Sequence, residues 1–370
     1  MSKDKPIWAI GCMSGTSMDA VDIGELLTDG ERIEEFGNSS MGFYDAERRA
    51  ILEAAVGSWP GDESVAEAER VILELHEEML TDSFRGSLIG FHGQTLAHDP
   101  DNGRTHQVGN GQDLADLMGI TTVWDFRARD MELGGQGAPL TPFFHFAIAK
   151  YLGETSPVVF LNLGGIANLT WVNAAEPLPE APGALVAFDT GPANTLIDSL
   201  MQSRSGSFYD HGGRVSGSGE VDEELLSELM KAPYFSLAPP KSLDRSHFMY
   251  SLDAMAHLSL EDAAATLAEF TARSIAEGFR HFPAVPSRVI ASGGGVYNKD
   301  LMRRLAYALP AEIVTADSVG LSSFALEALA FGYLAVRVLR GLPITCPSTT
   351  GCAKPAVGAR ISRPSETRDR

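Results

Sequence analysis

The same short pattern occurs twice in this chain: an apolar strand, a turn that contains glycine, and a second apolar strand. The first copy occupies residues 7–27, with its turn at 14–17, and the second occupies 158–172, with its turn at Gly164 and Gly165. Short apolar runs bounded by glycine and serine indicate strands joined by tight turns. Each copy opens a stretch in which strands and helices are mixed. The repetition therefore predicts an α/β protein with two similarly built lobes that face each other.

Apolar runs and helical periodicity predict the other elements. The predicted strands are 7–13, 21–27, 87–91, 120–124, 158–163, 167–172, 184–188 and 288–291. The predicted helices are 45–56, 64–84, 113–118, 142–151, 259–282 and 322–340, with further helices ending near Met201 and Ala308. A mobile loop is expected at 203–222, where serine, glycine and acidic residues are concentrated.

The length of the chain also indicates two domains, because 370 residues exceed what one hydrophobic core usually organises. We expect the first lobe to comprise residues 1–130 with 341–370, and the second to comprise 131–340. The polar segment 125–136 is the expected crossing between them. The cleft between two such lobes is the default place for a binding site.

The composition narrows the classes of partner. An apolar share of 44% and a charged share of 21% are those of an ordinary globular protein and exclude a largely disordered chain. The net charge of −20 argues against nucleic acid, because phosphate backbones are bound by clustered Lys and Arg. A ligand that carries phosphate would have to be held by backbone N–H groups, a metal ion and a few cations. Glycine-rich turns are therefore the expected phosphate sites.

Several features favour a cytoplasmic location. The cysteines, Cys12, Cys346 and Cys352, are few and lack metal-ligand spacing, which fits a reducing compartment. The apolar run at 7–13 is too short for a signal peptide. The apolar stretch 324–339 is interrupted by charged residues and does not predict a membrane span. We expect neither a membrane nor a nucleic acid among the partners.

Three turns contain the glycine that lets a backbone approach phosphate groups closely. They are the turn at Gly15, the turn at Gly164 and Gly165, and the run 293–295 before a predicted helix. Asp19, after the first turn, is a candidate for the magnesium side of a nucleotide. Neither the P-loop pattern nor the dinucleotide fingerprint is present. Each turn alone is equally compatible with an ordinary hairpin or helix cap, so the prediction depends on their order along the chain.

Two carboxylates are candidates for catalysis. Asp189 follows a predicted apolar strand, and open α/β sheets place ligands at such strand ends, where a carboxylate can act as a general base. The alternative is that Asp189 caps the next helix. Glu327 lies in an apolar helix, where a carboxylate requires a partner or has a raised pKa. Its alternatives are a solvent-facing position or an ion pair with arginine.

Polar residues suited to a sugar with an acetamido group and a carboxylate occur in three segments. These are 92–94, 125–127 and 134–137. Arg127 is the natural partner for the carboxylate, since a guanidinium binds it with two parallel hydrogen bonds. His92, His98 and His106 do not have the spacing of metal ligands, and we expect no zinc site.

With these residues in view, the sequence resembles the anhydro-N-acetylmuramic acid kinase family over essentially its whole length. The resemblance rests on an ordered set of motifs. They are MSGTSMD at 13–19 with Asp22, HGQT at 92–95, DFR at 125–127, GGQGAPL at 134–140, NLGGIAN at 162–168, FDTGP at 188–192 and GGGVYN at 293–298.

The resemblance implies the two-lobed actin-like ATPase fold with ribonuclease H-like lobes, and a set of roles. The family uses ATP and water to convert 1,6-anhydro-N-acetylmuramic acid into N-acetylmuramic acid 6-phosphate and ADP, in bacterial cell-wall recycling. Asp189 is then the base that activates water, Glu327 its supporting carboxylate and Asp19 the residue on the Mg²⁺ side. The implied nucleotide-binding residues are Gly15, Thr16, Ser17, Met18, Asp19, Ala20, Val21, Asp22, Gly164, Gly165, Asn168, Gly293, Gly294, Gly295 and Asn298. The expected sugar-binding residues are Ser14, His92, Gln94, Asp125, Arg127, Gln136 and Gly137.

Some alternatives stay open at this point. Ala20 and Ala193 stand where many relatives have glycine, so a positive φ at either would strain the loop. A kinase of the same fold for another sugar, an actin-like ATPase that switches a binding surface, and a sugar-responsive regulator are the rival functions. The regulator would require a basic helix-turn-helix segment, which we do not find. The expected partners are a small sugar and ATP, and the pattern leaves open whether the protein is a homodimer.

Overall fold

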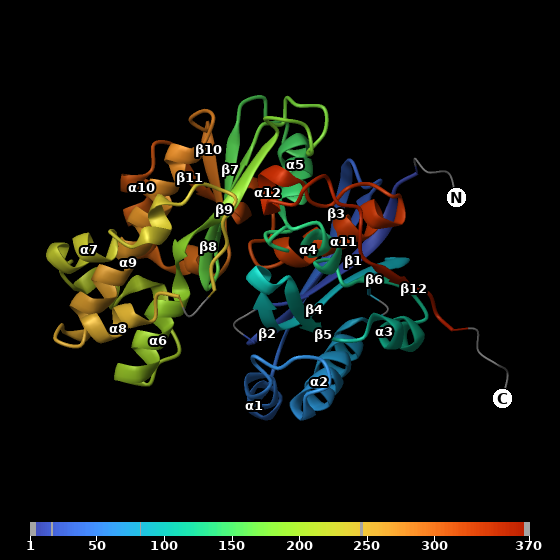
Figure 1. Ribbon diagram of the computed structural model, residues 1–370, viewed down its shortest axis with the longest axis horizontal. Helices are drawn as coiled ribbons and strands as arrows, with labels where there is room; N and C mark the ends of the chain where they lie inside the picture. The colour runs from blue at the N-terminus through green and yellow to red at the C-terminus, as the bar shows by residue number, and fades with distance from the viewer. Residues whose placement is uncertain (1–4, 16–17, 82, 245–246, 366–370) are drawn as a thin grey trace. The chain divides into compact units, whose positions relative to one another are not determined.

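The computed structural model describes residues 5–15, 18–81, 83–244 and 247–365. The chain forms two compact units, each with its own sheet (Figure 1). The first unit contains the described residues through Gly153 together with those from Ala325 onward, and the second is Glu154–Phe324. The expected mixed α/β class is confirmed.

The first unit has a sheet in the order β12-β6-β4-β1-β2-β3, with β5 paired to β4. Its strands are β1 (Ile7–Ser14), β2 (Ala20–Thr28), β3 (Ile33–Phe43), β4 (Leu88–Asp99), β5 (Arg104–Val108), β6 (Thr121–Trp124) and β12 (Arg360–Ser362). Its helices are α1 (Ala46–Ala54), α2 (Glu63–Met79), α3 (Gly111–Met118), α4 (Ala128–Glu132), α5 (Pro142–Tyr151), α11 (Leu326–Leu339) and α12 (Pro347–Thr350). β1 and β2 are antiparallel, as are β2 and β3, whereas β1, β4 and β6 are parallel.

The second unit has a sheet in the order β11-β10-β7-β8-β9. Its strands are β7 (Val158–Leu163), β8 (Ile166–Val172), β9 (Leu185–Pro192), β10 (Arg288–Ser292) and β11 (Glu312–Thr315). Its helices are α6 (Asn194–Ser205), α7 (Glu223–Leu229), α8 (Tyr250–Ala254), α9 (Leu260–Gly278) and α10 (Lys299–Ala308). Its 3₁₀ turns include η2 (His211–Gly213), η3 (Ser216–Ser218) and η6 (Gly294–Tyr297).

Both sheets repeat one arrangement. In each, a first strand pairs antiparallel with a second, the second pairs antiparallel with a third, and the first also begins a parallel set. The order β3-β2-β1-β4-β6 thus corresponds to β9-β8-β7-β10-β11. The two similarly built lobes predicted from the repeated hairpin are confirmed.

The two faces of the first sheet are covered differently. On β1, Ile10 and Cys12 point into a core shared with α2, and Gly11 between them faces α11. A Cβ on Gly11 would lie 1.7 Å from the Ala328 carbonyl oxygen. A Cβ on Gly90 of β4 would lie 2.0 Å from the carbonyl oxygen of Phe331, which is also in α11. Helix α11 therefore packs directly on the sheet backbone, which only glycine permits.

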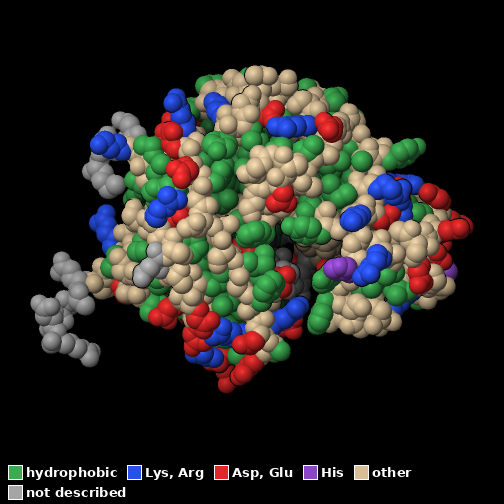
Figure 2. Space-filling model, turned by 180° about the vertical axis from the view of Figure 1, so that it is seen from behind, with side chains coloured by type: hydrophobic (Ala, Val, Ile, Leu, Met, Phe, Trp, Pro, Cys, Tyr) green, Lys and Arg blue, Asp and Glu red, His purple; other side chains and the backbone are tan. Residues whose placement is uncertain are grey.

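The surface over α1 and α2 carries acidic and basic side chains together, seen at the lower end of Figure 2. Arg48 of α1 pairs with Glu78 at 2.5 Å, and Arg70 pairs with Glu67 and Glu74 within α2. Such exposed pairs contribute little to stability individually. Among the described residues, no helix is both long enough and apolar enough to cross a membrane.

Three expectations about organisation differ from the structure. The units meet in sequence at 153/154 and 324/325, because α5 and α11 pack against strands of the first unit. The segment 125–136 contains α4 and belongs to the first unit, so it is not the crossing. The segment 203–222, expected as a mobile loop, contains the end of α6 and the turns η2 and η3.

Candidate active-site residues

Asp189 lies inside β9, not at a strand end as the sequence predicted, because β9 continues beyond it. It does not cap α6 either, since the N-cap position is Ala193. The register pairs polar residues on successive strands: Asp189 with Asn168, Asn168 with Asn162, and Asn162 with Ser292. Directly paired residues point to the same face of a sheet. The second unit therefore carries a row of polar side chains across β10, β7, β8 and β9, which ends at Asp189.

A segment before α8 holds Asp189 at three points. The Leu243 N–H donates to Oδ2 of Asp189 at 2.8 Å, the Asp189 N–H donates to the Lys241 carbonyl at 3.0 Å, and the Tyr234 hydroxyl donates to the Asp189 carbonyl at 2.7 Å. The Lys241 ammonium in turn donates to the Tyr234 carbonyl at 3.1 Å. Burial, and then the nearby Arg280, lower the pKa of Lys241 to about 8. The Leu243 N–H thus orients the Asp189 carboxylate, and the other two bonds hold the Asp189 backbone.

The two glycine turns of the second unit lie against each other. A Cβ on Gly293 would be 2.8 Å from the Leu163 carbonyl oxygen, and a Cβ on Gly295 would be 2.6 Å from Leu163 Cβ. Leu163 directly precedes Gly164, and its carbonyl accepts a hydrogen bond of 2.8 Å from Asn194 Nδ2. Gly293 also has a φ of +82°, which favours glycine. The structure therefore brings the second and third predicted phosphate turns together.

The carbonyl groups of the second glycine turn accept hydrogen bonds from the backbone at the start of α6. The Gly164 carbonyl accepts from the Asn194 N–H at 3.0 Å, and the Gly165 carbonyl accepts from the N–H groups of Ala193 and Thr195. This hydrogen bonding fixes the turn relative to α6. Gly294, the middle residue of the third turn, is exposed.

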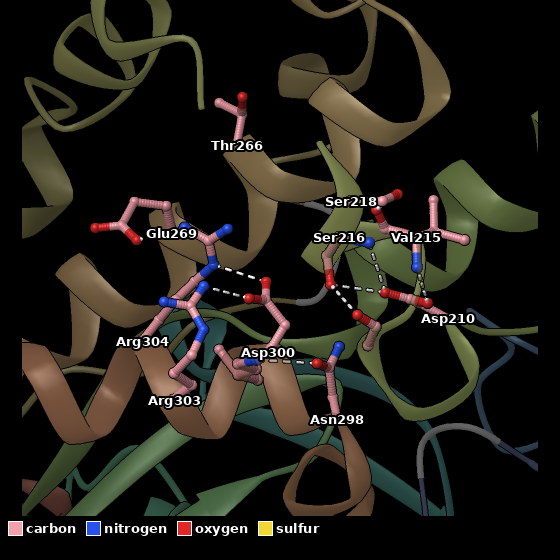
Figure 3. Close-up of polar contacts among 12 residues, drawn as sticks. Asp210, Val215, Ser216, Ser218, Thr266, Glu269, Asn298, Asp300, Arg303 and Arg304 are labelled. Carbon is pink, nitrogen blue, oxygen red and sulfur yellow. Dashed lines mark hydrogen bonds and ion pairs between the residues drawn. The ribbon is translucent and has the colours of Figure 1, made fainter. Parts of the chain in front are cut away.

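Asn298 is the N-cap residue of α10, with a side chain that accepts a backbone N–H. Next to it, Asp210 closes a loop, because its carboxylate accepts from the Val215 N–H at 2.9 Å, the Ser216 N–H at 3.0 Å and the Ser216 hydroxyl at 2.7 Å (Figure 3). A Cβ on Gly213 of this loop would lie 2.2 Å from Asn298 Oδ1. The loop thus packs on the first turn of the helix that follows the third glycine turn.

The first glycine turn belongs to the first unit. Thr16 and Ser17, both predicted to bind nucleotide, lie outside the described residues. The Met18 N–H donates to the Gly15 carbonyl at 3.1 Å, and the Met18 side chain is buried in the core with α2. The buried side chain of Met18 is therefore not placed to contact a ligand at this turn.

Neither of the two alanines that stand at glycine positions of relatives has a positive φ. Ala20 and Val21 begin β2 as regular strand residues, and Ala193 has a φ of −122°. Among the described residues, the non-glycine positions with positive φ are Met18 and Asp125. The left-handed conformation that would strain an alanine is therefore absent at both positions.

Asp22, Glu327 and Asp19 belong to the first unit, and the charges of Glu327 and Asp19 act on Asp22. Burial raises the pKa of Asp22 to about 7, and the charges of Glu327 and Asp19 add to the effect. Burial also raises the pKa of Glu327, against the opposing charge of Arg127. Oδ1 of Asp22 is buried and has no hydrogen-bond partner among the described residues. An orphaned carboxylate oxygen beside an exposed aspartate suits a cation.

Ser14 and Gln94, both predicted to contact the sugar, contact each other. The Ser14 hydroxyl donates to Gln94 Oε1 at 2.6 Å and lies 3.0 Å from the Tyr44 hydroxyl. Both residues are buried at the junction of β1 and β4. Their polar groups hold the two strands together.

His92 and Arg127 form a second polar group in this unit. Arg127 Nη2 lies 2.9 Å from His92 Nε2, and Nη1 donates to the Gly137 carbonyl at 2.7 Å. His92 Nδ1 is 2.8 Å from the Gly93 carbonyl and must donate to it, which leaves Nε2 as acceptor for the guanidinium. Burial, and then the Arg127 charge, lower the pKa of His92 well below its usual value. His92 is therefore a neutral partner of Arg127.

Gln136 and Asp125 complete the predicted sugar set. The Gln136 N–H donates to the Thr350 carbonyl at 2.8 Å. Asp125 has a φ of +58°, and its Oδ2 is 3.0 Å from Arg360 Nε. Burial raises the pKa of Asp125 in spite of Arg360. The ion pair with β12 is a structural role for Asp125 that the sequence did not indicate.

Comparison of the sequence with known proteins identifies the family of the chain. The family model of anhydro-N-acetylmuramic acid kinase matches residues 7–362. The chain belongs to this family. It is 51% identical over 365 residues to the anhydro-N-acetylmuramic acid kinase of Cereibacter sphaeroides, a match that covers 98% of each chain. It is 50% identical over 359 residues to anhydro-N-acetylmuramic acid kinase 1 of Jannaschia sp., covering 97% of this chain and 96% of the relative.

In this member of the anhydro-N-acetylmuramic acid kinase family, the structure places beside the predicted site residues several others to which the sequence assigned no role. They are Ser292 and Asn162 of the polar row, Asn194 at the paired glycine turns, and Lys241 and Leu243 beside Asp189. Asn162 lies within the NLGGIAN motif at 162–168, so the sequence did contain a signal for this residue. Leu243 acts through its backbone N–H, which carries no sequence signal.

Proposed function

We propose that this chain is a cytoplasmic kinase that uses ATP and water to open 1,6-anhydro-N-acetylmuramic acid and phosphorylate O6, giving N-acetylmuramic acid 6-phosphate and ADP in cell-wall recycling. The proposal is supported by membership of the family and by the polar row that ends at Asp189. That row is the single observation that carries it. It lies in the unit in which two glycine turns are packed together.

Asp189 is the general base in this proposal. Its carboxylate is oriented by the Leu243 N–H, so it can accept a proton from water without first reorienting. The proton leaves the water as its oxygen bonds to the anomeric carbon and the C1–O6 bond breaks. O6, the former bridge oxygen, takes the γ-phosphoryl group of ATP, and ADP is the leaving group. Glu327, with a pKa raised by burial, is the supporting carboxylate in the first unit.

In this proposal the phosphate groups of ATP bind to the glycine turns and to one magnesium ion. The backbones of Gly164, Gly165 and Gly293 to Gly295 are the proposed phosphate-binding groups, with Gly294 exposed, and Asn298 caps the helix beyond them. Asp19, with the orphaned Oδ1 of Asp22 nearby, is the proposed holder of Mg²⁺. When bound, the ion supplies positive charge that stabilises the transferring phosphoryl group.

Turnover in heavy-oxygen water tests the reaction. Mass spectrometry of the product made from the anhydro sugar and ATP should show one heavy oxygen at C1 and none in the phosphoryl group. A panel of other amino sugars, with labelled ATP, serves as the control for substrate class. Phosphorylation without label at C1, or a better substrate in the panel, would overturn the proposed reaction.

Asp189→Asn tests the base. The amide keeps the size of the side chain but cannot take a proton, so turnover should fall by at least about a hundredfold. Calorimetric titration with nucleotide should show unchanged binding. Near-normal turnover of the variant would remove Asp189 from this role.

A further inference from the structure

A buried carboxylate in the first unit belongs to none of the predicted roles. Asp130 of α4 is 1% exposed, and its two oxygens accept three hydrogen bonds. The Gly137 N–H donates at 2.8 Å, the Thr345 hydroxyl at 2.5 Å and the Thr350 hydroxyl at 2.6 Å. A buried charge is tolerated only when it is paired or fully hydrogen-bonded, and these donors meet that condition.

These bonds determine the path of the loop 134–137. Asp130 Oδ2 would lie 2.2 Å from a Cβ on Gly135, so the loop can wrap around the carboxylate only with glycine there. Gly137 is bonded through both of its backbone polar groups, because its N–H donates to Asp130 and its carbonyl accepts from Arg127 at 2.7 Å. The backbone of Gly137 therefore links the position of Asp130 to the guanidinium of Arg127.

The C-terminal segment after α11 supports the same loop from the other side. Besides the two threonine hydroxyls, the Thr350 carbonyl accepts from the Gln136 N–H at 2.8 Å, and the Ala353 N–H donates to the Leu133 carbonyl at 2.9 Å. Thr345 and Thr350 are both fully buried. Both backbone and side-chain hydrogen bonds therefore attach this segment to the loop.

We propose that Asp130 is a positioning residue for sugar recognition, which acts through the backbone of Gly137 on Arg127, with Thr345 and Thr350 as its own supports. The inference rests on the proposed function, together with the expectation from the sequence that Arg127 binds the carboxylate of the sugar. Arg127 is also oriented by the neutral His92, so its guanidinium is held on two sides. Without the bond to Asp130 the backbone of Gly137 is free to change conformation, and one of these two constraints on Arg127 is lost.

The first test compares two buried aspartates that accept the same number of hydrogen bonds. Asp130→Asn presents an amide that cannot satisfy all three donors, and the KM for the sugar should rise by about tenfold while the KM for ATP stays unchanged. Asp210→Asn is the matched control, because Asp210 is 5% exposed and accepts from two N–H groups and one hydroxyl in the second unit. It should leave the KM for the sugar unchanged. Equal changes of both KM values in Asp130→Asn, or the same sugar effect in Asp210→Asn, would overturn the proposal.

The second test uses milder changes, in case Asp130→Asn fails to fold. Thr350→Val removes one hydroxyl donor, and Thr350→Ser retains it. We expect Thr350→Val to raise the KM for the sugar and Thr350→Ser to restore the wild-type value. A loss in both variants would indicate packing alone and would overturn the proposal.

A spectroscopic readout separates this inference from the proposed function. The Nε–H signal of Arg127 in ¹H–¹⁵N spectra, assigned by its disappearance in Arg127→Lys, should shift or broaden in Thr350→Val and not in Asp210→Asn. This measurement needs no substrate. An unchanged Arg127 signal overturns the positioning role even if the anhydro sugar is turned over, whereas absence of turnover in the wild type overturns the proposed function alone.

Discussion

The chemistry of this chain depends on a few carboxylates whose surroundings differ. Asp189 receives a backbone N–H, Asp130 receives three donors, and Asp22 has a buried oxygen without a donor among the described residues. Donors stabilise the charged form of a carboxylate, and burial without donors stabilises the protonated form. The side chains are chemically alike, so their different roles follow from their neighbours.

Asp22 should make the stability of the protein depend on pH. Its pKa is raised from 3.8 to about 7, so the folded state keeps a proton that the unfolded state has already released. The contribution is complete at low pH and is lost as the pH rises from about 4 to about 7, with a slope approaching about 1 kcal/mol per pH unit. Urea unfolding without ligand should show a shallower pH slope for Asp22→Asn than for the wild type. Parallel slopes for the two proteins would contradict this prediction.

Glu327→Gln should lower turnover by about a hundredfold or more if the carboxylate takes part in proton transfer. The replacement preserves shape, and burial already disfavours the charge, so folding should be retained. Steady-state kinetics and circular dichroism measure the two quantities separately. If the rate constants of Glu327→Gln were unchanged, the role of Glu327 would be structural and not catalytic.

At the scale of elements, the sequence was informative where local pattern decides the structure. Both hairpins were predicted because apolar runs end at glycine, but β3 was missed, since it is an edge strand with mostly polar residues such as Glu34, Glu35 and Asn38. The carboxylate of Asp189 was predicted as catalytic, yet its donor lies 54 residues further along the chain. Contacts of that kind depend on the tertiary fold and leave no local pattern.

The packing of α11 on glycine can be tested directly. In Gly90→Ala the new Cβ would lie 2.0 Å from the Phe331 carbonyl oxygen, so α11 has to move, at a cost of about 1–3 kcal/mol or more. Turnover should fall as well, since α11 carries Glu327. Gly217→Ala is the control, because its Cβ would make ordinary contacts of 3.6–3.9 Å. Equal unfolding free energies for the two variants would show that α11 adjusts without strain.

At the scale of the whole molecule, the two units differ in continuity. The second is one stretch, Glu154–Phe324, whereas the first is completed only by residues from Ala325 onward. The sequence predicted such an insertion but placed its start too early and its end too late. An apolar helix such as α11 could pack on either sheet, so its assignment was not evident. What assigns α11 to the first unit is its fit to Gly11 and Gly90.

The continuous unit should fold alone. It has its own sheet and its own buried clusters, one around β7 and α10 and one between α6 and α9. We expect residues 154–324 to give a folded α/β protein with cooperative urea unfolding and dispersed NMR signals. A fragment of residues 1–153, which lacks α11, should not. Cooperative unfolding of that fragment would contradict the role assigned to α11.

The glycine surface of β1 and β4 has a consequence for synthesis on the ribosome. These strands leave the exit tunnel early, but the helix that covers them is translated only after the entire second unit. Because domains fold as their residues emerge, the inserted unit can reach its native state while the first sheet still exposes bare backbone and the apolar neighbours of Gly11 and Gly90. The nascent chain therefore passes through a stage in which the second unit is folded and the first still lacks α11, and at that stage it is exposed to chaperones and proteases.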